Sequence, residues 1–257
     1  MNEPTMESEQ ELRARRAGSF GAQAAAYAEH RPDYPVAALR WALDAVTPAP
    51  KIVLDLAAGT GKLTAGLVEL GLDVTAVEPD TGMLAELSRL LPSVTALEGQ
   101  AERIPLPDAS VDAVFVGQAF HWFDVDEALA EIARVLRPGG VLLALWNRDD
   151  ESVPWVAGFK SLTQTAASAS WTRHESGMPE SPAFGPFEES TFPHAHRRTA
   201  ETLVETVSTQ SHMLVADPAD AAETRRQMAE YLAAQPETSA GEFDLPLQTM
   251  SLRATRR

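Results

Sequence analysis

The chain has 257 residues, a hydrophobic fraction of 44%, no cysteine and a formal net charge of −16 at pH 7. Its length accommodates one α/β domain with a small lid, and the lack of cysteine excludes disulfides, cysteine-ligated metals and thiol chemistry. The negative charge repels a phosphate backbone, so we expect no nucleic-acid substrate, and we interpret short basic clusters such as Arg197-Arg198 as solvated surface.

The sequence also predicts a protein that acts without a membrane. No apolar run approaches the roughly 18 residues needed to cross a bilayer, and residues 1–10 lack the apolar stretch of a secretory signal. We therefore expect a cytoplasmic location. Residues 1–18 are polar, and we expect them to form a flexible N-terminus.

The first predicted elements are two short helices within residues 20–46, because Pro32 and Pro35 interrupt an otherwise helical segment. Short apolar runs and helical segments then alternate along the chain. The predicted strands are 52–56, 74–78, 94–98, 111–116 and 141–146, and the helices between them are 61–70, 80–91 and 125–137. This alternation predicts a doubly wound, mostly parallel sheet.

The pattern changes after Asn147. Residues 148–185 carry scattered aromatic residues, proline and glycine without a clear period, and we interpret them as an irregular helical segment over the sheet. The remaining predicted elements are strands at 187–199 and 244–253 and helices at 200–209 and 218–234. His194 and His196 share one strand face at a spacing that a metal could use. No third ligand is evident, so we interpret them as solvent-facing.

A turn rich in small residues follows the first strand. Asp55 ends that strand, Ala57, Gly59 and Gly61 lie two residues apart, and a helix begins directly afterwards. Glycines let a ligand approach the backbone, and the free N–H groups of a helix N-terminus favour an anionic or polar group. The turn does not match the G-x-G-x-x-G spacing of dinucleotide-binding proteins, so a bound pyrophosphate is disfavoured.

Two further features indicate a nucleoside site. Glu78 ends the second strand, where its carboxylate could accept hydrogen bonds from both hydroxyls of a ribose. The alternative is an ordinary solvated glutamate at a strand end. The third strand is followed by Gly99-Gln100-Ala101-Glu102, a loop that should border the same crevice and reach an adenine edge.

Residues 52–147 resemble the class I S-adenosylmethionine-dependent methyltransferases that act on small molecules. The resemblance lies in residues 53–61, Val77-Glu78-Pro79 with Met83, residues 99–105 and residues 131–140. Ahead of these, Phe20, Tyr27 and residues 31–35 resemble the N-terminal cap of the trans-aconitate methyltransferase-like subgroup, as do residues 118–123. Ala57 departs from the pattern, because most family members have the first glycine of the turn there.

The resemblance implies an α/β fold with a seven-stranded, mostly parallel Rossmann-like sheet, an antiparallel last strand and a helical lid. Residues 19–257 would form a single domain, and its parts would be an N-terminal cap at 20–46, a cofactor-binding core at 51–147, a lid and substrate region at 148–198 and the completion of the sheet at 199–257. The cofactor would be S-adenosyl-L-methionine, and a small molecule would accept its methyl group on oxygen, nitrogen or carbon. We expect a monomer or a homodimer.

The resemblance also implies roles for individual residues. The cofactor-binding residues would be Tyr27, Arg31, Asp55, Ala57, Ala58, Gly59, Gly61, Glu78, Pro79, Met83, Gln100, Ala101, Glu102, Gln118 and Ala119. The substrate pocket would be formed by Phe20, His121, Trp122, Trp146, Asn147 and Trp155. No metal is expected.

His121 is the candidate general base, because it should lie at the end of the fourth strand and imidazole titrates near neutrality. The alternative is a structural histidine that shapes the wall, since a base is needed only if the acceptor must lose a proton. Trp122 and Phe123 could face the sulfonium by cation–π contact or form core beneath a lid. Two other functions stay open: S-adenosylmethionine-dependent chemistry without methylation, such as a cyclisation, and a non-catalytic binding module.

Overall fold

The computed structural model describes residues 31–163, 178, 180–208, 213 and 217–257, and within them seven strands form one sheet in the order β3-β2-β1-β4-β5-β7-β6. The strands are β1 (Ile52–Leu56), β2 (Asp73–Glu78), β3 (Thr95–Glu98), β4 (Val111–Gly117), β5 (Leu136–Asp149), β6 (Glu188–Arg198) and β7 (Phe243–Thr255). β1 to β5 are parallel, whereas β7 is antiparallel to both β5 and β6. The predicted seven-stranded sheet with an antiparallel last strand is confirmed.

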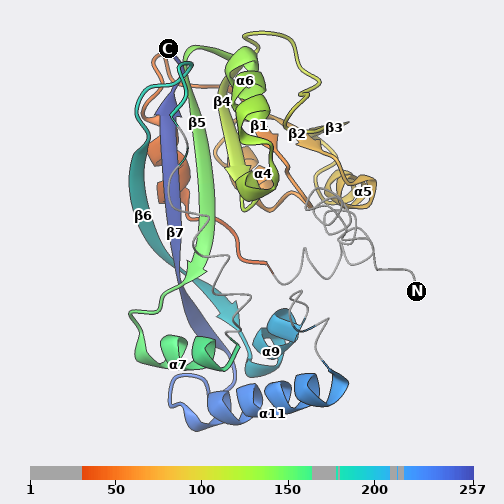
Figure 1. Cartoon of the computed structure of the whole chain (residues 1–257), viewed down its shortest axis with the longest axis vertical. Helices are drawn as coiled ribbons and strands as arrows, with labels where there is room; N and C mark the ends of the chain where they lie inside the picture. Colours follow the sequence, from red (N-terminus) through yellow and green to blue (C-terminus); the bar gives the residue numbers. More distant parts are fainter. Residues whose placement is uncertain (1–30, 164–177, 179, 209–212, 214–216) are drawn as a thin grey trace, which may run out of the picture.

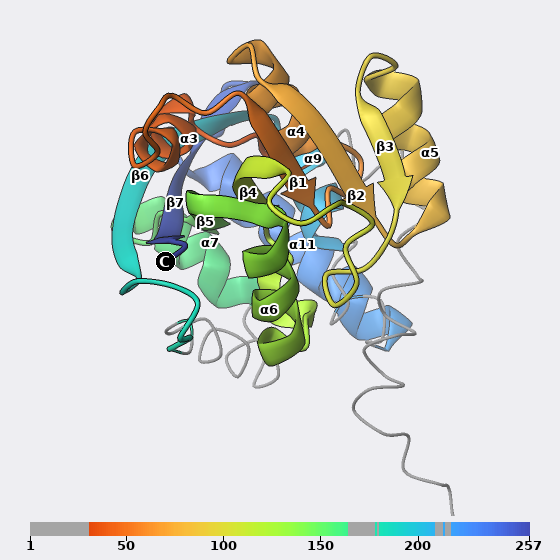
Figure 2. The same cartoon turned by 90° about the horizontal axis from the view of Figure 1, so that it is seen from above.

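Helices pack on both faces of the sheet (Figure 2). One face carries α6 (Val125–Val135), whose apolar residues pack against Leu54, Val114 and Leu142. The other face carries α3 (Val36–Leu43), α4 (Lys62–Glu69) and α5 (Thr81–Leu90). Strands covered on both faces are buried along residues 53–56 of β1, 113–116 of β4 and 140–146 of β5, which explains the continuous apolar runs at these positions.

The helix boundaries follow local capping chemistry. The side chain of Asp80 accepts hydrogen bonds from the N–H groups of Gly82 and Met83 at 2.9 Å, and Asp124 caps α6 through the N–H of Glu127. α4 begins directly after Gly61, whose φ of 90° lies in the left-handed region. The predicted helices of the core therefore differ from the observed ones by one or two residues at their ends.

β5 is longer than its predicted span of 141–146. It begins at Leu136, which pairs with Val111, and it continues to Asp149 because β7 pairs with it through Leu247. This extension places Asn147 within a strand rather than in a connecting loop. Asn147 consequently has a fixed position at the carboxyl end of the sheet.

A second layer of helices lies beyond the carboxyl end of β5, where β6 and β7 also extend (Figure 1). We name it the helical cap, and it consists of α7 (Pro154–Thr163), α9 (Ala200–Ser208) and α11 (Pro218–Ala234). Its own small core joins these helices to the start of β7 through Phe243, Leu245 and Leu247. The division of residues 19–257 into a lid and a C-terminal segment stays a prediction. The helical cap contains α7 from the predicted lid and both α9 and α11 from the predicted C-terminal segment.

Several predictions fall outside the described residues. These are the flexible N-terminus, the first of the two helices before residue 31, and the site residues Phe20 and Tyr27. Among the residues that are described, no helix combines the length and the apolar character needed to cross a membrane.

Candidate functional site

The glycine turn lies at the carboxyl end of β1, beside β4, where the strand order of the sheet reverses. Gly59 and Gly61 have φ angles of 57° and 90°, and a Cβ atom on Gly61 would lie 3.0 Å from side-chain atoms of Leu87 and Leu91. Position 61 therefore requires glycine on both conformational and steric grounds. The turn leads directly into α4, and the first N–H groups of a helix have no partner within the helix itself.

Glu78 is held against the turn at the carboxyl end of β2. Its side chain is 5% exposed, and its two oxygens accept hydrogen bonds from the N–H groups of Gly59 and Asp80, each at 2.9 Å. Burial raises the pKa of this carboxyl group, and the two backbone hydrogen bonds oppose that effect. A carboxylate has about four lone-pair positions, so Glu78 keeps acceptor capacity for a ligand in a fixed orientation.

Asp55 is more deeply buried, at 1% exposure. Its Oδ2 accepts a hydrogen bond of 2.6 Å from the hydroxyl of Thr64, whereas its Oδ1 is buried and has no partner among the described residues. Burial raises the pKa of Asp55 to about 7. Buried polar atoms are usually hydrogen-bonded, so this oxygen at the pocket wall suits a positively charged or N–H-bearing group of a ligand.

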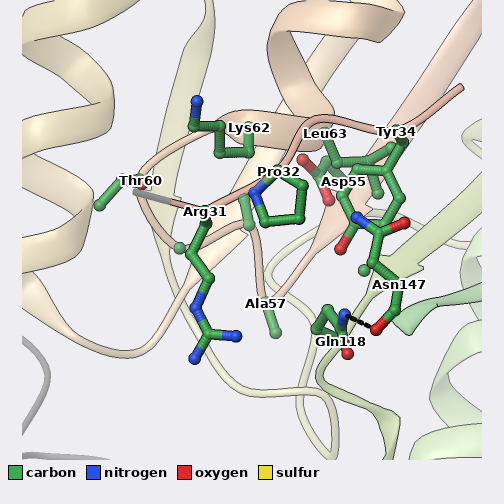
Figure 3. A pocket seen from close by; sticks show the side chains of 13 residues that line it. Arg31, Pro32, Tyr34, Asp55, Ala57, Thr60, Lys62, Leu63, Gln118 and Asn147 are labelled. Carbon is green, nitrogen blue, oxygen red and sulfur yellow. Dashed lines mark hydrogen bonds between the residues drawn. The ribbon is translucent and has the colours of Figure 1, made fainter. Parts of the chain in front are cut away.

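A pocket opens over the turn (Figure 3). Its lining comes from the turn, the segment before α3, the start of α4 and the ends of β4 and β5: Arg31, Pro32, Tyr34, Asp55, Ala57, Ala58, Gly59, Thr60, Lys62, Leu63, Gly117, Gln118 and Asn147. Two of these, Ala57 and Gln118, are non-glycine residues with a φ of 57°. Backbone strain of this kind concentrates at functional sites.

A chain of polar contacts ties the pocket walls together. The Nε2 of Gln118 donates to the backbone oxygen of Asn147 at 3.0 Å (Figure 3), and the Nδ2 of Asn147 donates to the backbone oxygen of Asp33 at 3.1 Å. The carboxylate of Asp33 forms an ion pair with Lys62, also at 3.1 Å. The segment that carries Arg31 is thus connected to β4, β5 and α4.

Met83 and Pro79 flank the turn without lining the pocket. The side chain of Met83 is 7% exposed, and its sulfur lies 3.8 Å from the position that a Cβ atom on Gly59 would occupy. Pro79 is exposed at the end of β2. Their predicted packing against adenine stays a prediction.

The loop after β3 has a rigid frame. Ala101 is buried, and the side chain of Glu102 accepts a hydrogen bond from the N–H of Asp124 at 2.8 Å. Arg134 of α6 donates to the backbone oxygens of Ile104 and Leu106, at 2.9 and 2.8 Å. Together with Gln100, which forms an isolated β-bridge to Arg103, these residues occupy the carboxyl edge of the sheet outside the described pocket.

The residues that were predicted to form the substrate pocket do not all lie in one pocket of the structure. Asn147 lines the pocket, and Ala119 precedes the short 3-10 helix η2 (Phe120–Trp122), where the His121 and Trp122 rings lie 4.9 Å apart. His121 and Trp122 are half-buried outside the described pocket, and Phe123 belongs to the core.

The other two tryptophans that were predicted to line the substrate pocket are core residues. Trp146 is 4% exposed and packs in the same core as α6. Trp155 lies inside the helical cap, packed edge-on against Phe243 with ring centroids 5.6 Å apart. The structure thus brings neither side chain to the pocket, because each fills a hydrophobic core instead.

The prediction that His194 and His196 face solvent is wrong, and so is the interpretation of Arg198 as solvated surface. The two histidines are half-buried, and Arg198 is 6% exposed on the same strand face. The Nε2 of His194 lies 3.2 Å from the Oδ1 of Asn147, which is the physical reason for its inward position. Within the described ranges, no three metal-ligating side chains form a group.

Sequence reasoning also missed several residues near the pocket. Lys62, Thr60 and Tyr34 line it, and Thr249 donates a hydrogen bond of 2.6 Å to Asn147. Lys62 follows the glycine turn directly, so its position was a usable signal. Thr249 had no such signal, because only the pairing of β5 with β7 brings it to Asn147.

Several known proteins are similar to this chain in sequence and in fold. A family model for a methyltransferase domain matches residues 54–144. An uncharacterized methyltransferase of Mycobacterium tuberculosis is 40% identical over 238 residues, which cover 92% of this chain and 95% of the relative. A demethylmenaquinone methyltransferase of Beutenbergia cavernae is 41% identical over 127 residues, which cover 48% of this chain and 50% of the relative. The solved structure of a candidate type II methyltransferase from Anaeromyxobacter dehalogenans is 30% identical, with a TM-score of 0.69 over 88% of this chain and 97% of its own.

These similarities cover the sheet, the glycine turn and the helical cap. The trans-aconitate methyltransferase-like subgroup stays a prediction. The observed strand order, the pocket over the turn and the near full-length relatives agree with one another. The chain therefore belongs to the class I S-adenosylmethionine-dependent methyltransferases, and S-adenosylmethionine is its cofactor.

Proposed function

We propose that this methyltransferase transfers the methyl group of S-adenosylmethionine to a small-molecule acceptor bound between the carboxyl ends of the strands and the helical cap. The observation that carries this proposal is the pocket over the turn, where the buried Oδ1 of Asp55 lacks a partner among the described residues. One relative is named for a small-molecule acceptor, demethylmenaquinone, which supports the same class of acceptor here.

The residues of the pocket, together with Glu78 beside the turn, fit the cofactor. Asp55 Oδ1 would accept a hydrogen bond from the ammonium group of its methionine end, which satisfies the oxygen and offsets the burial of the carboxylate. The remaining lone pairs of Glu78 would accept hydrogen bonds from the ribose hydroxyls. The backbone of Ala57 to Gly61, with left-handed φ at residues 57, 59 and 61, allows close approach between these two anchors.

S-adenosylmethionine supplies, when bound, a methyl group on a positively charged sulfur. Because this group is already reactive, the protein accelerates the in-line displacement mainly by holding the acceptor at attack distance and excluding water. The contact between Gln118 and Asn147 sets the wall at the end of β4 and β5. His121, in the 3-10 helix after β4, is our candidate to take up a proton from an acceptor that must lose one.

Mass spectrometry of reaction mixtures tests the proposal. The full chain would be incubated with a library of small molecules and S-adenosylmethionine that carries a trideuterated methyl group. A product that gains the labelled methyl group supports methyl transfer to a small molecule. An isomer without mass change, or a labelled protein or nucleic acid in place of a small molecule, contradicts it.

A further inference from the structure

A short segment of chain borders the pocket just before α3. We name residues 31–35 the strap, and three of its residues, Arg31, Pro32 and Tyr34, line the pocket together with the glycine turn (Figure 3). Pro32 and Pro35 have no backbone N–H group, and each favours extended backbone at the residue before it. The strap is therefore stiff and has few backbone donors, so its position depends on side chains of the neighbouring elements.

Two side chains hold the strap through Asp33. The Nδ2 of Asn147 donates a hydrogen bond to the backbone oxygen of Asp33 at 3.1 Å, and Lys62 forms an ion pair with its carboxylate, also at 3.1 Å. The carboxylate is 79% exposed, and exposed ion pairs made by flexible lysine side chains contribute little. Asn147 has a short side chain that further hydrogen bonds fix, so it is the contact that can define the position of the strap.

The backbone oxygen of Asp33 requires one orientation of the Asn147 amide. A carbonyl oxygen only accepts hydrogen bonds, so the amide nitrogen must face Asp33 and the amide oxygen must face β6 and β7. There the Oδ1 of Asn147 accepts a hydrogen bond of 2.6 Å from the hydroxyl of Thr249, and the Nε2 of His194 lies 3.2 Å away. Both neighbours must donate in this arrangement, and Thr249 makes the shorter contact.

Thr249 lies behind Asn147 and outside the described pocket. Its side chain is fully buried, at 0% exposure, and it pairs directly with Asn147 across the ladder of β5 and β7. Directly paired residues share one face of a sheet, so the hydroxyl reaches the amide from the neighbouring strand. Gln118, by contrast, donates to the backbone oxygen of Asn147, so its contact does not depend on how the amide is oriented. Thr249 therefore acts on the strap side of Asn147.

We propose that Thr249 is a positioning residue for cofactor binding. Its hydroxyl orients the amide of Asn147, the amide holds the strap through Asp33, and the strap completes the wall over the glycine turn. Apparent affinity follows the fraction of molecules in which a binding wall is in place, so a residue that does not touch the cofactor controls its binding. The inference rests on the proposed function at one point, that this pocket receives the methionine end of S-adenosylmethionine.

Fluorine NMR on the cofactor-free full chain, labelled with 3-fluorotyrosine, tests whether Thr249 positions the strap. The chain has three tyrosines, and Tyr34→Phe identifies the signal that belongs to the strap. This signal is sensitive to displacement, because a Cβ atom on Gly117 would lie 2.6 Å from the hydroxyl oxygen of Tyr34, so the ring lies close against the backbone of β4. Tyr231, whose hydroxyl donates to the backbone oxygen of Trp155 in the helical cap, is the internal reference.

Thr249→Val removes the hydroxyl and keeps the shape of the side chain, so we expect a shifted or second Tyr34 signal and an unchanged Tyr231 signal. Thr249→Ser keeps a hydroxyl donor and should retain the single Tyr34 signal of the unmodified chain. Ser251→Ala is the matched control, because Ser251 shares the strand face of Thr249, is fully buried, and its hydroxyl has no partner among the described residues. If Thr249→Val fails to fold, Asn147→Ala carries the test, with the same change expected in the Tyr34 signal.

Calorimetry with S-adenosylmethionine on the same samples tests whether the strap controls cofactor binding. We expect Thr249→Val to weaken binding about threefold to tenfold, the loss expected for one hydrogen bond. Thr249→Ser and Ser251→Ala should bind as tightly as the unmodified chain. A threonine with a merely structural role would change the free energy of unfolding and leave both the Tyr34 signal and the affinity of the folded protein as they are.

Three results would overturn the proposal. An unchanged Tyr34 signal in Thr249→Val and Asn147→Ala would show that other contacts hold the strap. A changed Tyr34 signal with unchanged cofactor affinity would show that the strap does not control binding, and equal effects of Ser251→Ala and Thr249→Val would show a general loosening of β7. Failure of the unmodified chain to bind S-adenosylmethionine contradicts the proposed function itself, and it is distinguishable because the Tyr34 signals are measured without cofactor.

Discussion

Replacing Asp55 by asparagine should change the stability of the fold and the affinity for the cofactor in opposite directions. Asp55 is 1% exposed, its Oδ2 accepts a hydrogen bond from Thr64, and its Oδ1 has no partner among the described residues. Asparagine has nearly the same shape and can still accept the hydrogen bond from Thr64 through its amide oxygen. The substitution therefore removes the charge and little else.

The size of the expected change in folding stability follows from the pKa of Asp55, which burial raises from 3.8 to about 7. Between these values the folded chain keeps a proton on Asp55 that the unfolded chain has lost, so stability decreases as pH rises from about 4 to about 7. One pKa unit corresponds to about 1.4 kcal/mol, so the ionised carboxylate costs the cofactor-free fold about 4 kcal/mol at pH 8. Asp55→Asn removes this cost.

Urea denaturation of the cofactor-free protein measures this effect. At about pH 8 we expect Asp55→Asn to unfold with a free energy several kcal/mol higher than that of the unmodified chain, and at about pH 4 the difference should nearly vanish. Calorimetry should show the opposite order for S-adenosylmethionine, with affinity lowered at least about tenfold by the loss of a charged acceptor. Asp73→Asn, at the exposed start of β2, is the matched control and should change neither quantity.

Two results would refute this reasoning. Equal stability of Asp55→Asn and the unmodified chain at about pH 8 would show that ionisation of Asp55 is not costly to the fold. Unchanged affinity for S-adenosylmethionine would show that the Oδ1 of Asp55 does not pair with the cofactor.

Three further substitutions test the site. Glu78→Gln leaves the N–H group of either Gly59 or Asp80 without an acceptor and removes a charged contact to the ribose. Calorimetry should therefore show roughly tenfold to hundredfold weaker cofactor binding. Unchanged affinity would argue against this role of Glu78. Ala57→Gly relieves a left-handed φ of 57° that costs an L-residue roughly 1–2 kcal/mol, partly offset by the greater freedom of glycine in the unfolded chain. The free energy of unfolding in urea should rise by up to about 1 kcal/mol, and a decrease would contradict the argument. His121→Ala should lower turnover far more than cofactor affinity, and the base assignment fails if both decrease together or neither changes.

The core of the fold, and the position of the glycine turn beside Glu78, could be predicted because their signals are local. The strands β1, β4 and β5 are buried on both faces and therefore read as apolar runs. The turn from Asp55 to Gly61 and the position of Glu78 follow from the ends of two neighbouring strands. Each feature lies within a few residues of the strand that positions it.

The contacts around Asn147 could not be predicted, because they depend on distant strand pairing. His194 meets Asn147 only because β6 pairs with β7 and β7 pairs with β5. In the sequence, His194 and Arg198 are polar residues in an alternating strand, with no sign of which face is buried. Trp155 was predicted to line the substrate pocket, because it is an aromatic residue that follows β5. The structure instead places it in the core of the helical cap.

Calorimetric titration of the unmodified chain with S-adenosylmethionine, and separately with NAD, tests the central claim most directly. The turn lacks dinucleotide spacing, and Asp55 places a buried carboxylate at the pocket wall, so we predict saturable binding of S-adenosylmethionine at one site and no binding of NAD. Binding of NAD without binding of S-adenosylmethionine would contradict the account.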